Sequence, residues 1–157
     1  MEHQLDWNQE STMKQQVTGL LDRYSLRATL YILAKTREFT TQNGKKLLTI
    51  LFDPYRAMTD MQKGGARYDQ EIVDYLKKEK FGYFDMNEVH LRDFKKYSLA
   101  FDEYLKEYFH GHYNPRGNNF FAYSIKDVVV NWLDPKPITY RNPNPEGIEF
   151  GDSLKRK

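Results

Sequence analysis

The sequence predicts an α/β fold in which a few parallel strands are joined by helices. Two short apolar segments, residues 45–52 and 83–86, have the length of buried strands and are bounded by polar residues, glycine or proline. A segment with helical periodicity lies between them, the order expected of a parallel pair with a right-handed crossover. We therefore expect one α/β domain over residues 12–134, after a flexible segment 1–11 and before an extended tail 135–157.

The first predicted element is a long helix over residues 12–43. Ser11 or Thr12 can cap its start, and Gly44 can end it. Apolar residues recur through it at close to the 3.6-residue period of an amphipathic helix: Val17, Leu20, Leu21, Tyr24, Ala28, Tyr31, Leu33 and Ala34.

The strand at 45–52 is followed by a predicted loop over 53–66, a helix over 68–80 and the second strand at 83–86. Residues 87–109 are expected to be helical or mixed. Their aromatic side chains recur at three- and four-residue spacing, which favours packing in the core over a substrate-binding wall: Phe94, Tyr97, Phe101, Tyr104, Tyr108 and Phe109. Two strands are too few for a stable parallel sheet. Either further strands exist, or the chain is part of a larger domain, or other chains complete the sheet.

The composition excludes several classes of protein. A net charge of +2 is too small to indicate nucleic-acid binding. The absence of cysteine excludes disulfides, thiolate metal sites and a cysteine nucleophile. No apolar run approaches the roughly 18 residues of a membrane helix, and the polar, acidic start is not a signal peptide. We expect a cytoplasmic protein, or an extracytoplasmic one if an N-terminal part is missing.

The stretch HGHYNPRGN, residues 110–118, is the most informative of the chain. Asn114 is a good N-cap, Pro115 suits the first helical turn, and Gly117 allows a close backbone approach. A helix is predicted from about Pro115 to Leu133, with its apolar residues buried: Phe120, Phe121, Ile125, Val128, Val129, Trp132 and Leu133. His112 precedes the cap by two residues, so we expect its ring to be held at the rim of the sheet, where open α/β folds bind ligands.

The motif His-x-Asn-Pro-x-Gly-Asn before an apolar helix resembles the final block of the SGNH (GDSL) hydrolase family. The preceding segments LLTILFDP, QEIVDYLKKE and YFDMNE follow the order of that family, so the resemblance covers about residues 45–134. It implies a three-layer flavodoxin-like sandwich, of which this chain would hold only the C-terminal half.

The resemblance also implies a function, the hydrolysis of an ester such as an acylated carbohydrate or lipid, without a cofactor. His112 would be the general base for a serine nucleophile, and Asn114, Pro115 and Gly117 would be structural. The acidic residue expected two or three places before the histidine is replaced by His110 and Phe109, so Glu107 or Asp102 would have to substitute. The first forty residues hold no Gly-Asp-Ser turn, and the chain alone is expected to be inactive.

A second match to the nucleophile motif stands near the C-terminus, in Phe150-Gly151-Asp152-Ser153-Leu154. Ser153 would reach His112 only in a permuted chain or from a neighbour's tail, and too few residues follow it for the helix that such a serine needs. Coincidence or the start of a truncated element is the preferred interpretation.

Two other sites and a second function remain open. His110 and His112 have a spacing that can suit a metal, but no third ligand is evident, so no metal is predicted. Arg56 could bind an anion, although a strand-to-loop turn explains Asp53-Pro54 equally well. The alternative function is a non-catalytic interaction module that forms a homo-oligomer through an exposed sheet edge.

Overall fold

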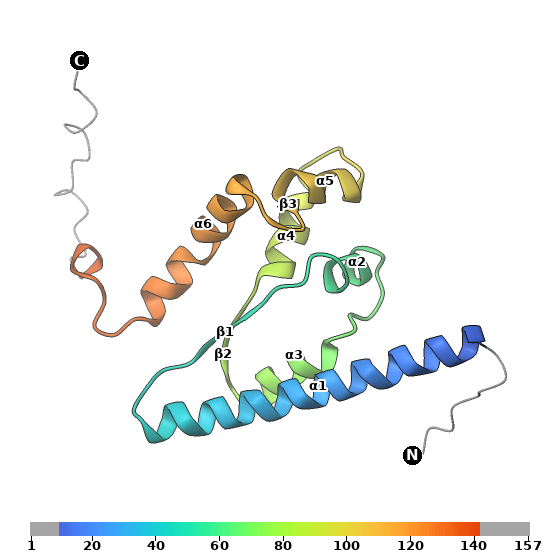
Figure 1. The fold of residues 1–157 in the computed structure, drawn as a ribbon. Coiled ribbons are helices and arrows are strands. Elements are labelled where there is room, and N and C mark those ends of the chain that lie inside the picture. The colour runs from blue at the N-terminus through green and yellow to red at the C-terminus, as the bar shows by residue number, and fades with distance from the viewer. Residues whose placement is uncertain (1–9, 142–157) are drawn as a thin grey trace. The chain divides into compact units, whose positions relative to one another are not determined.

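The computed structural model describes residues 10–141, and these form two compact units, residues 10–101 and 102–141, which we call the first and the second unit. Figure 1 follows the elements along the chain. The first unit holds α1 (Glu10–Gln42), β1 (Leu48–Leu51), α2 (Ala57–Gln62), α3 (Gln70–Lys78), β2 (Gly82–Asp85) and α4 (Met86–Phe94). The second holds almost all of α5 (Phe101–Tyr108), then β3 (Phe109–His110), β4 (His112–Tyr113), α6 (Pro115–Trp132) and a 3-10 turn (Ile138–Tyr140).

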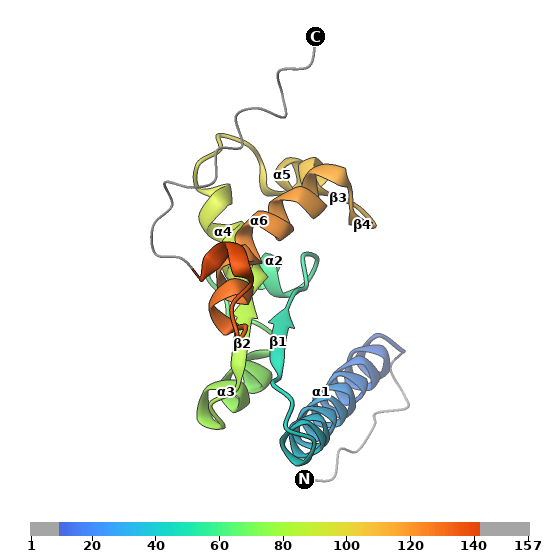
Figure 2. The ribbon, with the colours of Figure 1, turned by 90° about the vertical axis from the view of Figure 1, so that its left-hand side faces the viewer.

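The predicted three-layer flavodoxin-like sandwich is wrong for the chain as described. Helices account for 65% of the described residues, and the parallel sheet within them has only two strands. A layer of two four-residue strands is too small to separate two layers of helices, so the structure is mostly helical. The strand–helix–strand unit itself is confirmed. β1 and β2 are parallel, with Leu48 opposite Gly82 and Leu51 opposite Asp85, and Figure 2 shows them side by side.

The core of the first unit lies where α2, α3 and α4 meet the sheet. Its buried apolar residues are Ala57, Met58, Ile72, Val73, Leu76 and Met86. Helix α2 falls within the segment predicted to be a loop. Its start is organised by Asp53, whose Oδ1 accepts hydrogen bonds from the backbone N–H groups of Tyr55 and Arg56 at 3.1 and 3.0 Å. The chain therefore turns sharply after β1 and enters a short helix, although its sequence has little helical periodicity.

Helix α1 begins and ends close to the predicted residues, but none of its residues is buried. At about 100° per residue, Leu26, Leu30 and Leu33 share one side of the helix. All three are half-buried, and Arg37 on the same side binds the backbone oxygen of Glu79 after α3. The opposite side carries Val17, Leu20, Leu21, Tyr24 and Tyr31, which we call the outer stripe. Its residues are between 37% and 75% exposed.

The second unit is built around α6. The predicted helix is confirmed, but the expected burial of its apolar face is not, since only Gly117 and Ile125 are buried and Leu133 is 36% exposed. Of the six aromatic residues predicted to pack in the core, Tyr104, Tyr108 and Phe109 are buried, Phe94 and Phe101 are half-buried, and Tyr97 is 37% exposed. No helix within residues 10–141 is long and apolar enough to cross a membrane.

Candidate functional site

The predicted histidine segment forms a tight β-hairpin, which the sequence reading missed. Phe109 lies opposite Tyr113, and His110 lies opposite His112 across the antiparallel pair β3–β4. Gly111 makes the turn with a φ of +78°, a left-handed conformation that favours glycine. Side chains opposite each other across such a pair point to the same face, so the hairpin has one His-His face and one aromatic face.

The aromatic face anchors the hairpin. The rings of Phe109 and Tyr113 stack with their centroids 4.7 Å apart, and Phe109 is buried. Tyr113 also approaches Phe121 of α6, with ring centroids 6.0 Å apart, and burial raises the pKa of the Tyr113 hydroxyl. Because side chains alternate along a strand, His110 and His112 project from the other face, and both are exposed.

The ring of His112 makes one recorded hydrogen bond, between its Nδ1 and the backbone oxygen of Tyr113 at 3.0 Å. A carbonyl oxygen can only accept a hydrogen bond, so Nδ1 must carry the proton in this arrangement. The neutral ring then has its free lone pair on Nε2. The hairpin therefore offers one oriented, basic nitrogen on an exposed face.

Asn114 joins the hairpin to α6 and is the N-cap of this helix, as the sequence predicts. Its Oδ1 accepts the Gly117 N–H at 2.9 Å, and its Nδ2 donates to the backbone oxygen of Glu107 at 3.0 Å. Its backbone N–H donates to the Tyr108 oxygen at 2.9 Å. Asn114 thus links α6, α5 and the hairpin, and Pro115 occupies the first helical position.

Gly117 stands where a side chain does not fit. A Cβ at this position would lie 2.2 Å from Cδ1 of Tyr113 and 2.4 Å from the backbone oxygen of Tyr108. Arg116 beside it binds the Glu107 carboxylate and lies over the Tyr108 ring, 5.1 Å from its centroid. These contacts hold the first turn of α6 against the end of α5.

The structure does not bring a catalytic triad together within residues 10–141. It records no hydrogen bond or ion pair from the His112 ring to a carboxylate or to a serine hydroxyl. Glu107, one proposed substitute for the acidic residue, binds Arg116 instead. Asp102, the other, lies in the first turn of α5. Ser153 lies outside the described residues. His112 lies in a hairpin of the second unit, whereas the parallel sheet belongs to the first unit.

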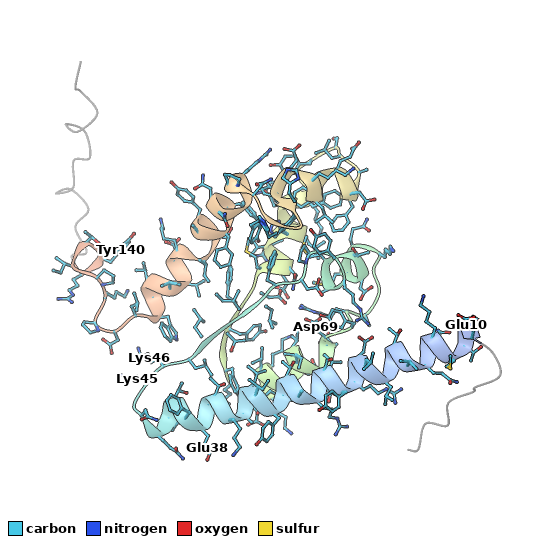
Figure 3. The ribbon with its side chains drawn as sticks, in the orientation of Figure 1. Glu10, Glu38, Lys45, Lys46, Asp69 and Tyr140 are labelled. Atoms are coloured by element: carbon cyan, nitrogen blue, oxygen red, sulfur yellow. The ribbon has the colours of Figure 1, made fainter. Side chains whose placement is uncertain are left out.

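A second polar cluster, at the ends of the parallel strands, was not predicted. Arg67 is buried and binds both oxygens of Asp69, through Nε at 2.5 Å and Nη2 at 2.8 Å, and also Asp85 at the end of β2. Asp69 lies just before α3 (Figure 3). Burial alone would lower the pKa of Arg67, but the hydrogen bonds and charges of the two carboxylates outweigh it and raise that pKa.

The cluster continues to β1 through Asn87. Asp85 accepts the Asn87 N–H at 3.0 Å, and the Asn87 Oδ1 accepts the N–H of Asp53, which follows β1, at 2.7 Å. The pKa of Tyr68 is raised to about 12, mainly by burial and secondly by a hydrogen bond with Asp53. In the described part of the chain, no three histidine, aspartate or glutamate side chains are grouped to hold a metal ion. The cluster joins the two strand ends to α3 and α4.

Comparisons with known proteins leave the family of the chain open. No protein-family model matches it, and no curated protein or solved structure is significantly similar to it.

Proposed function

We propose that the chain carries the histidine of an SGNH-type ester hydrolase, with His112 as the general base. The observation that carries this proposal is the Nδ1 hydrogen bond to the Tyr113 carbonyl, which leaves the Nε2 lone pair on an exposed ring. A general base needs that protonation state and access to substrate. The contacts of Asn114 and Gly117 support the proposal, because they would hold the ring in one place while the reaction proceeds.

The nucleophile in this proposal comes from outside residues 10–141. A serine hydroxyl attacks the ester carbonyl and passes its proton to Nε2 of His112, which then gives that proton to the leaving alcohol. Water releases the acyl group by the same route. The Tyr113 carbonyl takes the place of the usual carboxylate at Nδ1. It orients the ring but stabilises the imidazolium less, so a slow enzyme is expected.

The test compares hydrolysis of p-nitrophenyl acetate by the 157-residue chain with hydrolysis by the product of any open reading frame that continues upstream of Met1. The product that contains the nucleophile should turn over the ester and be labelled at one serine by a fluorophosphonate. His112→Gln should lower turnover by a factor of roughly 10²–10⁴, the usual contribution of a general base.

His110→Gln is the matched control, because it changes the neighbouring exposed histidine and should leave turnover within about twofold. Equal turnover in the His112 and His110 variants would contradict the proposal, as would the absence of labelling in every product.

The second candidate function is a self-associating module, and the outer stripe of α1 favours it. Val17, Tyr24 and Tyr31 are seven residues apart, the spacing of a helix that packs against another helix. Figure 3 shows side chains projecting from α1 along its length, between the labelled Glu10 and Glu38. A second copy of the chain is the proposed partner. The outer edges of β1 and β2, which pair with no further strand within residues 10–141, would be a further contact.

Sedimentation velocity tests this candidate. The wild-type chain should sediment as a dimer or larger species, and Leu21→Glu with Tyr24→Glu should convert it to a monomer. Thr29→Glu, a charge placed on an exposed residue of α1 away from the outer stripe, should leave the assembly intact. A monomeric wild-type chain at all concentrations would exclude this function.

A further inference from the structure

We propose that His110 and His112 together form a two-histidine site for a divalent first-row transition-metal ion, of the class to which Cu²⁺ and Zn²⁺ belong. The proposal rests on the register of the hairpin, which places the two residues directly opposite each other. It does not depend on the proposed hydrolase or on self-association.

The register brings the two imidazoles to one face. In directly opposed positions of an antiparallel pair, Cβ atoms lie about 4.5–5.5 Å apart, which is within the reach of two imidazoles that share one ion. The stacking of Phe109 on Tyr113 at 4.7 Å shows that the neighbouring pair does share a face. Since the strands alternate, the histidines share the other face.

The chemistry of the rings suits a metal. A histidine that binds a metal through one nitrogen usually donates its other N–H to a carbonyl or a carboxylate, which sets the tautomer and the ring orientation. His112 already has this arrangement, with Nδ1 bound to the Tyr113 oxygen and Nε2 free. Within residues 10–141 the structure records no hydrogen bond or ion pair for the His110 ring, and both side chains are exposed.

The donor set selects the class of metal. Neutral imidazole nitrogens suit Cu²⁺, Zn²⁺ and Ni²⁺, whereas Mg²⁺ and Ca²⁺ prefer oxygen ligands. No described carboxylate joins the pair, so the remaining coordination positions are left to water or to a ligand from solution. A bound ion would occupy the Nε2 lone pair of His112, and the metal-bound protein could not use that nitrogen as a base.

Cu²⁺ is the probe of choice because it binds most strongly among these ions. The chain has four histidines. His90 is fully buried, and His3 lies outside the described residues, so the titration uses the full chain with His3→Asn.

Calorimetry should give one Cu²⁺ per chain, and the electron paramagnetic resonance spectrum should show coupling to two imidazole nitrogens. Mg²⁺ should not bind.

Three variants in this background test the geometry. His110→Asn and His112→Asn should each weaken Cu²⁺ binding by about tenfold or more, because each leaves a single ligand and removes the advantage of chelation. Gly111→Ala keeps both histidines but places a side chain at a φ of +78°, and it should also weaken binding. Gly19→Ala, the control in an open position on α1, should leave the Cu²⁺ affinity unchanged.

Equal Cu²⁺ affinity in the parent and in either histidine variant, with helicity retained by circular dichroism, would overturn the proposal, as would coupling to one nitrogen only. Because these measurements follow bound metal and not ester turnover, the metal site and the hydrolase can each fail without the other.

Discussion

Arg67 joins the end of β2 to the residue before α3 through ion pairs with Asp85 and Asp69. Its guanidinium is buried between Asp69 and Asp85, so one cation is shared by two carboxylates that water barely reaches. Buried ion pairs contribute modest net stability, but the removal of one partner leaves an uncompensated buried charge, which is costly.

Arg67→Met should therefore lower the free energy of unfolding by about 3–5 kcal/mol, measured by urea denaturation. Arg92→Ala is the control. Arg92 pairs with Glu88 on the exposed surface of α4 at 3.7 Å, and its loss should cost about 0.5 kcal/mol or less. The triple variant Arg67→Met, Asp69→Asn, Asp85→Asn should recover part of the lost stability. A small effect of Arg67→Met would contradict the role given to the cluster.

His90 is fully buried in α4, where its ring lies 6.1 Å from that of Phe52. Burial lowers the pKa of His90 from 6.5 to about 4, although the charge of Asp93 acts in the opposite direction. Between these two pH values the unfolded chain binds a proton that the folded chain does not. The contribution of His90 to stability is therefore complete above pH 6.5 and is lost as the pH falls towards 4.

The free energy of unfolding should thus decrease by about 3 kcal/mol more between pH 7 and 4 in the wild type than in His90→Asn. Urea denaturation at several pH values measures the difference. Carboxylates contribute to the pH dependence of both proteins, so the difference between the two pH profiles isolates His90. Parallel pH profiles for the two proteins would show that the imidazole is not kept neutral by burial.

Helix α6 depends on its first turn, where Gly117 contacts Tyr113 and Tyr108. Gly117→Ala should destabilise the second unit by about 1–3 kcal/mol, because the ring of Tyr113 or the backbone must shift to admit the methyl group. Trp132, at the end of α6, reports the loss by fluorescence. Gly19→Ala, inside α1 with open space around it, should instead stabilise its helix by about 0.5–1 kcal/mol. A neutral Gly117→Ala would contradict the close packing of the hairpin on α6.

Helix α1 lies close to the residues predicted for it, but it does not have the single buried apolar face of an amphipathic helix. Its apolar residues occupy two opposite sides, the half-buried one near α3 and the exposed outer stripe. A helix with two apolar sides has no single amphipathic face to bury. The spacing of residues such as Leu21 and Tyr24 predicts the helix, whereas which side is covered depends on what packs against it.

At the scale of the molecule, α1 exposes several large apolar side chains, with Leu21, Tyr31 and Phe39 each at least 60% exposed. Contiguous exposed apolar side chains mark interaction surfaces in soluble proteins. If a second copy covers this surface, folding is linked to association. The melting temperature should then rise with protein concentration, as measured by calorimetry over a hundredfold range. A melting temperature independent of concentration would indicate that the surface stays open or binds something else.

The sequence by itself determined the features that depend on short-range chemistry. It specified the long first helix, the parallel strand–helix–strand order, and the Asn114 cap with Pro115 at the first turn of α6, because periodicity and capping act within a few residues. Tertiary structure decided the rest. It placed Arg67, Asp69 and Asp85 together, paired His110 with His112 across Gly111, and left the outer stripe of α1 exposed. Those outcomes depend on contacts between distant segments or on backbone direction, which residue spacing does not encode.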